Sequence, residues 1–301
     1  MNPNSSPGPH RLRPVFGYVA VVGILPYLLL KLAWIAGVEI GVTEPGLMTT
    51  AVMRAANAFT AAMELVAIVV VLTLTHRWGL RVPAGLVVFP MWVGTGLLVP
   101  IVVSFPAIGA DFLMVGSTNE GLADWVTPVV YTSFAWQGTV LVAAFALYAR
   151  VRWPQAFSGA AGSRGVGPIG VTGAVLAFAV AVAEFRDVFA GGLRLANTVL
   201  GVVEALAALS AVVAVALLGA RGPHRAVTVL LWTGSATLFA SGFWSLFGWL
   251  AMSDEVHPLG WLLAATGCLA GLLLAFTFFS RVAVPGRDHS VPGVRPVPHT
   301  P

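Results

Sequence analysis

The chain contains few charged residues, one lysine and one cysteine. Only 9% of its 301 residues are charged, which is too few to cover a soluble globular protein of this length. Cys268 is the single cysteine, so an intramolecular disulfide and a cysteine-based metal site are both excluded. The six histidines fall in expected loops, tails and helix ends, which excludes a haem held by two histidines at mid-membrane.

Motifs of common catalytic sites are also missing. The chain has no HExxH motif, no aspartate-rich pair of the kind that carries a metal-bound diphosphate, and no glycine loop that leads into a lysine. The sequence therefore predicts a protein that is not an enzyme and binds no metal or other cofactor. A membrane-embedded enzyme acting on lipid is the least favoured of three interpretations.

Long apolar segments make up most of what is present. Hydrophobic residues account for 58% of the chain and the mean hydropathy is +0.89. About 20 apolar residues suffice to cross a hydrocarbon core roughly 30 Å thick. Eight segments qualify: 14–37, 51–75, 83–105, 127–149, 168–190, 195–219, 226–248 and 258–280. The sequence therefore predicts an all-α, eight-helix membrane protein. Tails 1–13 and 282–301 are expected to be disordered, because they are rich in Pro, Gly, Ser and His.

The distribution of charge predicts the orientation, because basic residues remain on the cytoplasmic side. Twelve of the 16 basic residues fall on one side: Arg11, Arg13, Arg77, Arg81, Arg150, Arg152, Arg164, Arg221, Arg225, Arg281, Arg287 and Arg295. The opposite side collects acidic residues: Glu39, Glu44, Asp111, Glu120, Asp124, Asp254 and Glu255. We therefore expect both termini in the cytoplasm and the protein in the plasma membrane. The partners expected are the lipid bilayer and a protein docked on the acidic outer loop 105–126; binding to nucleic acid is not expected.

Residues 54–96 and 194–236 resemble two copies of one segment. They align without a gap at a spacing of 140, and 11 of their 43 positions are identical. Most of these identities are of types that rarely match by chance in apolar sequence: Arg54/Arg194, Asn57/Asn197, Glu64/Glu204, Gly79/Gly219, Arg81/Arg221, Pro83/Pro223, Trp92/Trp232 and Gly94/Gly234. The sequence therefore predicts a duplicated bundle.

The duplication extends outward with a changing spacing. Gly17 aligns with Gly167 at 150, and Phe145 aligns with Phe276 at 131. The second copy is therefore shorter in its first outer loop and again in its last outer loop. Because each copy has four spans, both insert the same way up, and the repeats are parallel. The predicted units are repeat 14–149, a basic cytoplasmic linker 150–167 and repeat 168–281.

Polar residues inside the spans are the candidate site. On a helix that turns 100° per residue, Arg54, Asn57 and Glu64 share an arc of about 80°. The second copy has the same types at the same spacing: Arg194, Asn197 and Glu204. Both glutamates are expected near the bilayer centre, where a charge costs on the order of 2.5–3.5 kcal/mol. They must therefore face the bundle interior, and each must be protonated or paired.

Two tryptophans are expected at the same depth as the glutamates. Trp92 and Trp232 lie well inside their spans, away from the interfacial belt where membrane tryptophans usually gather. Such a residue needs a hydrogen-bond acceptor for its indole N–H. We hypothesise that Trp92 bonds Glu64 and that Trp232 bonds Glu204.

The outer ends of the first helix differ between the two copies. Lys31, the only lysine, marks the first copy, whereas Glu184, Arg186 and Asp187 mark the second. Glu184 and Asp187 share a helix face, but ion pairing with Arg186 or Arg194 is favoured over a metal site. Gln137, on the fourth helix, is a further candidate for the same cavity. The embedded and outer-edge charges balance: Lys31, Arg54, Arg186 and Arg194 against Glu64, Glu184, Asp187 and Glu204.

Two interpretations of these charges remain open. In the working interpretation, a polar cavity carries a small solute, an ion or protons, with Glu64 and Glu204 at its centre and Lys31, Arg54 and Arg194 at its outer mouth. In the alternative, the protein is a scaffold or accessory subunit, and the same residues are structural ion pairs between helices. A water-filled cavity would favour the first interpretation, and a sealed core the second.

Three segments carry a resemblance to a known family. The segments 26–34, 92–100 and 134–138 (PYLLLKLAW, WVGTGLLVP and FAWQG) resemble a family of uncharacterised actinobacterial multi-pass membrane proteins. The resemblance covers most of the first half and less of the second. It implies an eight-helix membrane fold and no established activity. Some family members bear a ring-opening dioxygenase label, but this chain lacks the iron ligands which that chemistry requires.

Overall fold

A computed structural model describes residues 9–117, 121–154, 165–252 and 258–282. Eight long helices make up most of this part of the chain, and all eight are long and apolar enough to cross a membrane. They are α1 (Pro9–Ile35), α2 (Ala51–Thr75), α3 (Ala84–Val115), α4 (Val126–Arg152), α6 (Pro168–Ala190), α7 (Leu195–Arg221), α8 (Arg225–Met252) and α9 (Pro258–Arg281). The predicted all-α membrane architecture is confirmed. The predicted tails and linker lie largely outside the described residues, although α1 begins as early as Pro9.

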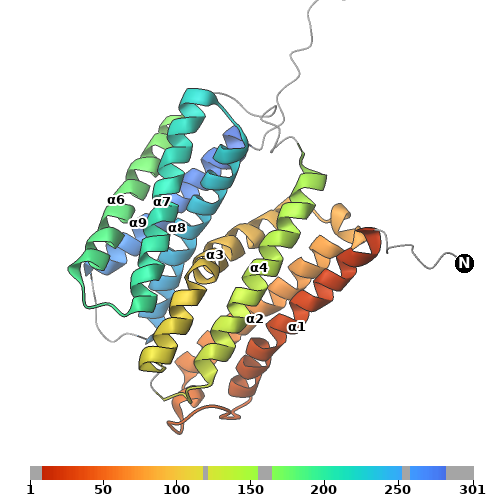
Figure 1. The fold of residues 1–301 in the computed structure, drawn as a ribbon, viewed down its shortest axis with the longest axis vertical. Coiled ribbons are helices and arrows are strands. Elements are labelled where there is room, and N and C mark those ends of the chain that lie inside the picture. The colour runs from red at the N-terminus through yellow and green to blue at the C-terminus, as the bar shows by residue number, and fades with distance from the viewer. Residues whose placement is uncertain (1–8, 118–120, 155–164, 253–257, 283–301) are drawn as a thin grey trace, which may run out of the picture.

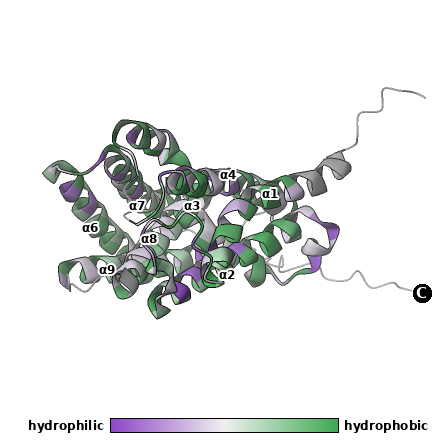
Figure 2. Cartoon of the chain, turned by 90° about the horizontal axis from the view of Figure 1, so that it is seen from below, coloured by the Kyte–Doolittle hydropathy of each residue, from purple (hydrophilic) through white to green (hydrophobic). Residues whose placement is uncertain are grey.

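The helices form two groups of four that lie side by side (Figure 1). The first group is α1–α4 and the second is α6–α9, and they meet mainly where α3 packs against α8. Apolar residues are spread around the helices (Figure 2), as expected for helices that face both lipid and neighbouring helices. The helices alternate in direction, so the bundle has two ends. We call the end with Arg77, Arg81, Arg150, Arg152, Arg221, Arg225 and Arg281 the basic end, and the end with Glu39, Glu44, Asp111 and Asp124 the acidic end.

Helix α3 is longer than predicted. It runs ten residues past the expected end at 105 and contains Pro90, Pro100 and Pro106. A proline removes one backbone donor and usually ends or kinks a helix, but in a membrane the packed neighbours can compensate for the lost bond. The helix ends at Gly116, whose φ of 83° is left-handed. The predicted outer loop 105–126 is therefore wrong in its first part, because 105–115 is helix.

The two groups differ in the way their cores are packed. In the second group one alanine-rich cluster joins all four helices. Its alanines are Ala174, Ala177, Ala181, Ala208, Ala211, Ala214 and Ala270. In the first group the buried apolar residues fall into separate clusters. Buried polar side chains between α1, α2 and α4, among them Asn57, Glu64 and Gln137, separate these clusters.

Close contact between α3 and α8 depends on a glycine. A Cβ added to Gly96 would lie 2.1 Å from the carbonyl oxygen of Ala236, whereas a Cβ added to Gly94 would have no atom within 4 Å. We therefore expect Gly96→Ala to lower the free energy of unfolding by about 1–3 kcal/mol, as overpacking does. Gly94→Ala is the matched control and should be neutral or stabilising, because alanine favours helix. Thermal unfolding in detergent compares the two variants, and equal melting temperatures would contradict the contact.

Candidate functional site

The single lysine lies partly buried between helices α1 and α2, close to the acidic end. Lys31 Nζ donates a hydrogen bond to Asn57 Oδ1 at 2.8 Å. Asn57 Nδ2 in turn lies 3.5 Å from the sulfur of Met48. The Lys31 ammonium also lies over two aromatic rings, 4.9 Å from the centroid of Tyr27 and 4.8 Å from that of Trp34. The rings stabilise the charge through their π faces, and Asn57 supplies an oxygen acceptor.

The glutamate at the centre of α2 is buried. Glu64 is 5% exposed and lies at the middle of a 25-residue helix. Gln137 Nε2 of α4 donates to both carboxylate oxygens, at 3.2 and 3.4 Å. Gln137 was only a secondary candidate from the sequence, but it is the residue that holds Glu64. Burial of Glu64 in the bundle interior is as expected.

Polar side chains connect these two positions. Asn57, Thr60 and Glu64 follow one face of α2, and all three are buried. The hydroxyl of Tyr27 lies beside the side chain of Thr60, between the other two levels. We call Lys31, Asn57, Thr60, Tyr27, Glu64 and Gln137 the polar ladder. Asn57 and Glu64 are seven residues apart, so the ladder extends about 10 Å along the membrane normal.

The two ladder charges do not pair with each other. Among the residues that the structure describes, Lys31 and Glu64 take part in no ion pair. Each is instead bound to a neutral amide, Asn57 or Gln137. The charges still act on each other electrostatically through the bundle interior.

A small cap covers the ladder at the acidic end. Residues 36–50 and 121–125 form this cap, and they meet in an antiparallel bridge between Val42 and Leu122. Thr43 N donates to the carbonyl of Gly121 at 2.8 Å, and Trp34 Nε1 donates to Ile40 O at 2.8 Å. Met48, 5% exposed, packs from the cap onto the helices. The cap thus covers Asn57 at the acidic end, whereas Lys31 remains partly exposed.

Among the described residues, the second group has no connection as long as segment 36–50 of the cap. This segment corresponds to the short connection 191–194 between α6 and α7. The two loops that sequence spacing identifies as longer in the first half are therefore the ones that build the cap. The ladder also stops at Glu64, because apolar side chains that include Val70, Val71 and Leu74 fill the bundle between it and the basic end.

The second copy of the polar residues is arranged differently. Glu204 is only partly buried and makes no hydrogen bond within the described residues. Its neighbouring charge is the carboxylate of Glu184 on α6. Asn197 is exposed, and so is Arg54 of the first copy. The two copies therefore do not form the symmetrical site that the sequence predicts, in which an arginine stands at the mouth of each copy.

The predicted bonds between the tryptophans and the glutamates are also wrong. Trp92 Nε1 donates to Ser235 Oγ at 3.0 Å, and Trp232 Nε1 donates to Thr95 Oγ1 at 3.3 Å. Both bonds cross from one group of helices to the other at the α3–α8 contact. They are reciprocal, because Ser235 is three residues after Trp232 and Thr95 is three residues after Trp92. The prediction assumed that residues at the same depth are in contact. In the structure, the face of α3 that carries Trp92 is turned toward α8 and away from α2.

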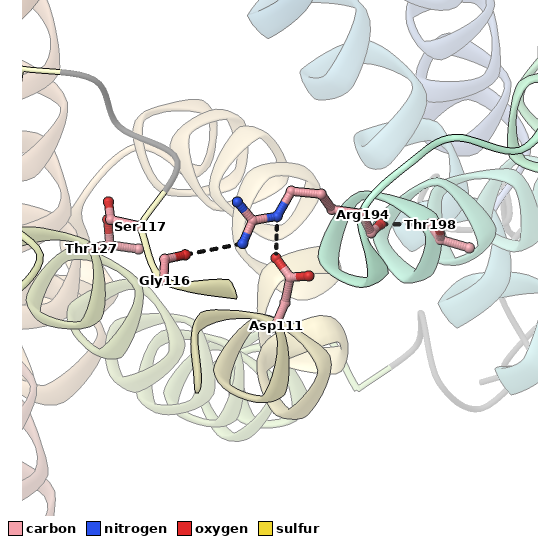
Figure 3. Close-up of polar contacts among 6 residues, drawn as sticks. All are labelled: Asp111, Gly116, Ser117, Thr127, Arg194 and Thr198. Atoms are coloured by element: carbon pink, nitrogen blue, oxygen red, sulfur yellow. Dashed lines mark hydrogen bonds and ion pairs between the residues drawn. The ribbon is translucent and has the colours of Figure 1, made fainter. Parts of the chain in front are cut away.

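An ion pair joins the two groups near the acidic end (Figure 3). Arg194 Nε donates to Asp111 Oδ2 at 2.9 Å, and its second nitrogen donates to Gly116 O at 3.0 Å. The side chain of Asp111 is 9% exposed and that of Arg194 is 27% exposed. Asp111 was assigned to the outer loop and not to the site, because the sequence does not show that α3 continues past Pro106.

The remaining candidates lie at the surface. Arg186 and Asp187 pair with each other at 2.7 Å with side chains more than half exposed. The predicted network of four positive and four negative charges is therefore not formed as one unit. No group of three or more His, Cys, Asp or Glu in the described segments could hold a metal ion. The chemistry available is hydrogen bonding and proton transfer among the ladder residues.

Comparison with known proteins yields no relative. No family model matches the chain, and no curated protein or solved structure is similar to it. The resemblance to the actinobacterial family thus stays a prediction, and the multi-pass membrane architecture stands on the eight apolar helices. Function must be argued from the geometry alone.

Proposed function

We propose that the protein carries protons, or a small ion or solute coupled to them, through the first group of helices, with Glu64 as the central proton-binding residue. The supporting observation is that the buried Glu64 and the partly buried Lys31 are held by neutral amides and not by each other. This proposal keeps the working interpretation of the sequence but restricts it to one half. It assigns no catalytic chemistry to the chain.

The cost of burying charge supports this choice. A charged residue at the bilayer centre costs about 2.5–3.5 kcal/mol on insertion scales. A purely structural pair recovers part of that cost through direct contact and good geometry. Lys31 and Glu64 forgo that contact. Ionisable residues inside membranes are, for this reason, functional-site candidates by default.

The amide partners suit a group that changes its protonation state. Gln137 has both donor and acceptor atoms. It therefore donates to Glu64 when the carboxylate is charged and, with its amide turned over, accepts from the carboxylic acid when Glu64 is neutral. Asn57 has the same two capacities beside Lys31. Thr60 and Tyr27 add hydroxyl groups between the two levels, which proton transfer along the ladder requires.

The path to Glu64 is proposed to open through the cap. Met48 and the Val42–Leu122 bridge close the acidic end over Lys31 and Asn57. Gly37, Gly41, Gly46 and Gly121 in the cap have φ values between 70° and 84°, a range that favours glycine. Because basic residues remain on the cytoplasmic side, we propose that the acidic end and its cap face outward and that both termini are cytoplasmic, in the plasma membrane.

The second group is proposed to be a degenerate copy with a structural role. The reciprocal Trp92–Ser235 and Trp232–Thr95 bonds support a duplicated origin, since both pairs of positions are related by the sequence spacing of 140. Its alanine-rich core is continuous, and Glu204 lacks the amide partner that Glu64 has. We propose that this group holds α3 in place while the first group carries protons.

Currents after a rapid pH change test the proposal. Protein reconstituted on a solid-supported membrane should give a transient current that Glu64→Gln abolishes. Glu204→Gln is the matched control and should keep most of the current, because the second copy has no ladder. Both variants should remain folded, since glutamine preserves the size of the side chain. A current that survives Glu64→Gln would contradict the proposal.

A scaffold or accessory role is the second candidate. It is favoured by the burial of Asn57, Thr60 and Glu64 and by the Arg194–Asp111 pair, which joins the two groups. In that case the wild type gives no current above that of protein-free membranes, and Glu64→Gln only lowers the melting temperature. A protein partner at the acidic end would then be sought.

A further inference from the structure

Two aromatic rings and one amide oxygen surround the ammonium group of Lys31. Its Nζ atom lies 4.9 Å from the ring centroid of Tyr27, 4.8 Å from that of Trp34 and 2.8 Å from Asn57 Oδ1. We call Tyr27, Trp34 and Asn57 the ammonium cage. Within the described part of the chain, Lys31 forms no ion pair with a carboxylate. Aromatic cages bind ammonium groups through their π faces, and proteins use them to recognise free ammonium ligands. The ammonium cage therefore has the chemistry of a site for a small organic cation.

Each wall of the ammonium cage is held in place by contacts that do not involve the lysine. The indole N–H of Trp34 donates to Ile40 O at 2.8 Å. The ring of Tyr27 meets that of Phe134 edge to face, with 4.8 Å between the centroids. Asn57 Nδ2 lies 3.5 Å from a methionine sulfur of the cap. All three wall residues are buried. The cage should therefore keep its shape when the lysine side chain is shortened.

The ammonium cage lies between the acidic end and the central glutamate. Asn57 forms one wall of the cage, and it shares a buried face of α2 with Glu64. A cation that enters the ladder from the acidic end therefore meets the Lys31 ammonium before it reaches Glu64. A fixed positive charge is an electrostatic barrier to free cations, as it is in selective pores. A proton needs no such space, because hydroxyl and carboxyl groups can pass it on along hydrogen bonds.

We propose that Lys31 is a tethered cation, which fills a site for a small free ammonium ion and makes the ladder selective for protons over such cations. This inference rests on the proposed proton pathway and narrows its substrate to the proton itself. Lys31 is thus assigned as the residue that determines specificity, whereas Glu64 binds the transported proton. Shortening Lys31 should open the ammonium cage to a free primary ammonium ion.

Chemical rescue tests the ammonium cage without any transport measurement. Lys31→Ala removes three carbons and the nitrogen from the side chain, and n-propylammonium has the same three carbons and nitrogen. In detergent, n-propylammonium chloride should raise the melting temperature of Lys31→Ala by about 2–4 °C relative to an equal concentration of sodium chloride, and the rise should saturate. The melting temperature of the wild type should not change, because Lys31 already fills the cage.

Arg54→Ala is the matched control for this rescue. It removes an exposed positive charge from the acidic end of α2 and leaves the ammonium cage filled, so n-propylammonium should affect it no more than the wild type. If Lys31→Ala does not fold, Lys31→Met keeps the apolar stem and empties only the place of the nitrogen, and ammonium chloride is then the probe. A lysine variant that responds no more than the wild type would overturn the cage as a cation site.

Selectivity has a separate readout on the solid-supported membrane. The wild type should give a current after a pH jump and none after a jump in n-propylammonium at constant pH, whereas Lys31→Ala should gain a current in the second jump. A wild-type current with n-propylammonium, or none from Lys31→Ala, would overturn the role of Lys31 in selectivity. If the wild type gives no pH-jump current but n-propylammonium still stabilises Lys31→Ala, the proton pathway fails and the cation site stands. A pH-jump current without that stabilisation means that only the present inference fails.

Discussion

A disulfide across the cap should stop the proton current, and a reductant should restore it. Val42 and Leu122 face each other in an antiparallel bridge. Cα atoms in such pairs are about 4.5–5.5 Å apart, which lies within the disulfide range of about 4.4–6.8 Å. Val42→Cys with Leu122→Cys, in a Cys268→Ala background, should therefore cross-link the two loops. The oxidised protein should lose the pH-jump current because the cap can no longer leave Lys31.

The controls for this experiment use the same background. Val42→Cys alone forms no intramolecular disulfide and should keep its current in oxidant. Reduction of the double variant should bring its current back to the level of that control. A cross-linked protein that conducts fully would show that the cap is not on the path, and protons would then have to reach Glu64 from another side.

Loss of the ion pair between the two groups should cause the largest drop in stability. Asp111→Asn leaves the Arg194 guanidinium next to a neutral group in a mostly buried position. Removing one partner of a buried pair costs about 3–5 kcal/mol, and the partial exposure of Arg194 places the expected loss at the lower end of that range. Denaturant unfolding in mixed micelles measures the change.

Asp187→Asn is the matched control for that prediction. Asp187 also pairs with an arginine, Arg186, but both side chains are more than half exposed. Pairs of this kind contribute about 0–1 kcal/mol, so the control should unfold almost as the wild type does. Equal effects of the two substitutions would mean that the pair between α3 and α7 does not hold the groups together.

The architecture was readable from the sequence because it depends on composition and length. Eight apolar runs predict eight spans, and the structure has eight such helices. The end of α3 was misplaced because Pro106 and Asp111 resemble loop residues when they are taken singly. In the fold, Asp111 is compensated by Arg194, which lies 83 positions away. Local sequence carries no sign of such a partner.

The sequence could predict how deep each site residue lies along its helix, but not which neighbouring helix its side chain faces. Helix periodicity places Glu64 near the middle of its span and Asn57 on the same face, and in the structure both are buried on α2. It does not give the rotation of one helix relative to another. Trp92 was therefore assigned to Glu64, whereas it bonds Ser235. For the same reason the sequence could not show that the first and last outer loops of the first half meet in one cap.

Proton uptake by lipid vesicles tests the central claim most directly. A potassium diffusion potential drives protons inward, and a trapped dye reports the internal pH. Wild-type vesicles should acidify faster than protein-free vesicles, and Glu64→Gln vesicles should match the protein-free rate. The double variant Glu64→Gln with Gln137→Glu should recover part of the uptake, because it moves the carboxylate to the other side of the same hydrogen-bonded pair. Uptake by Glu64→Gln vesicles at the wild-type rate would contradict the account, and so would wild-type vesicles no faster than protein-free ones.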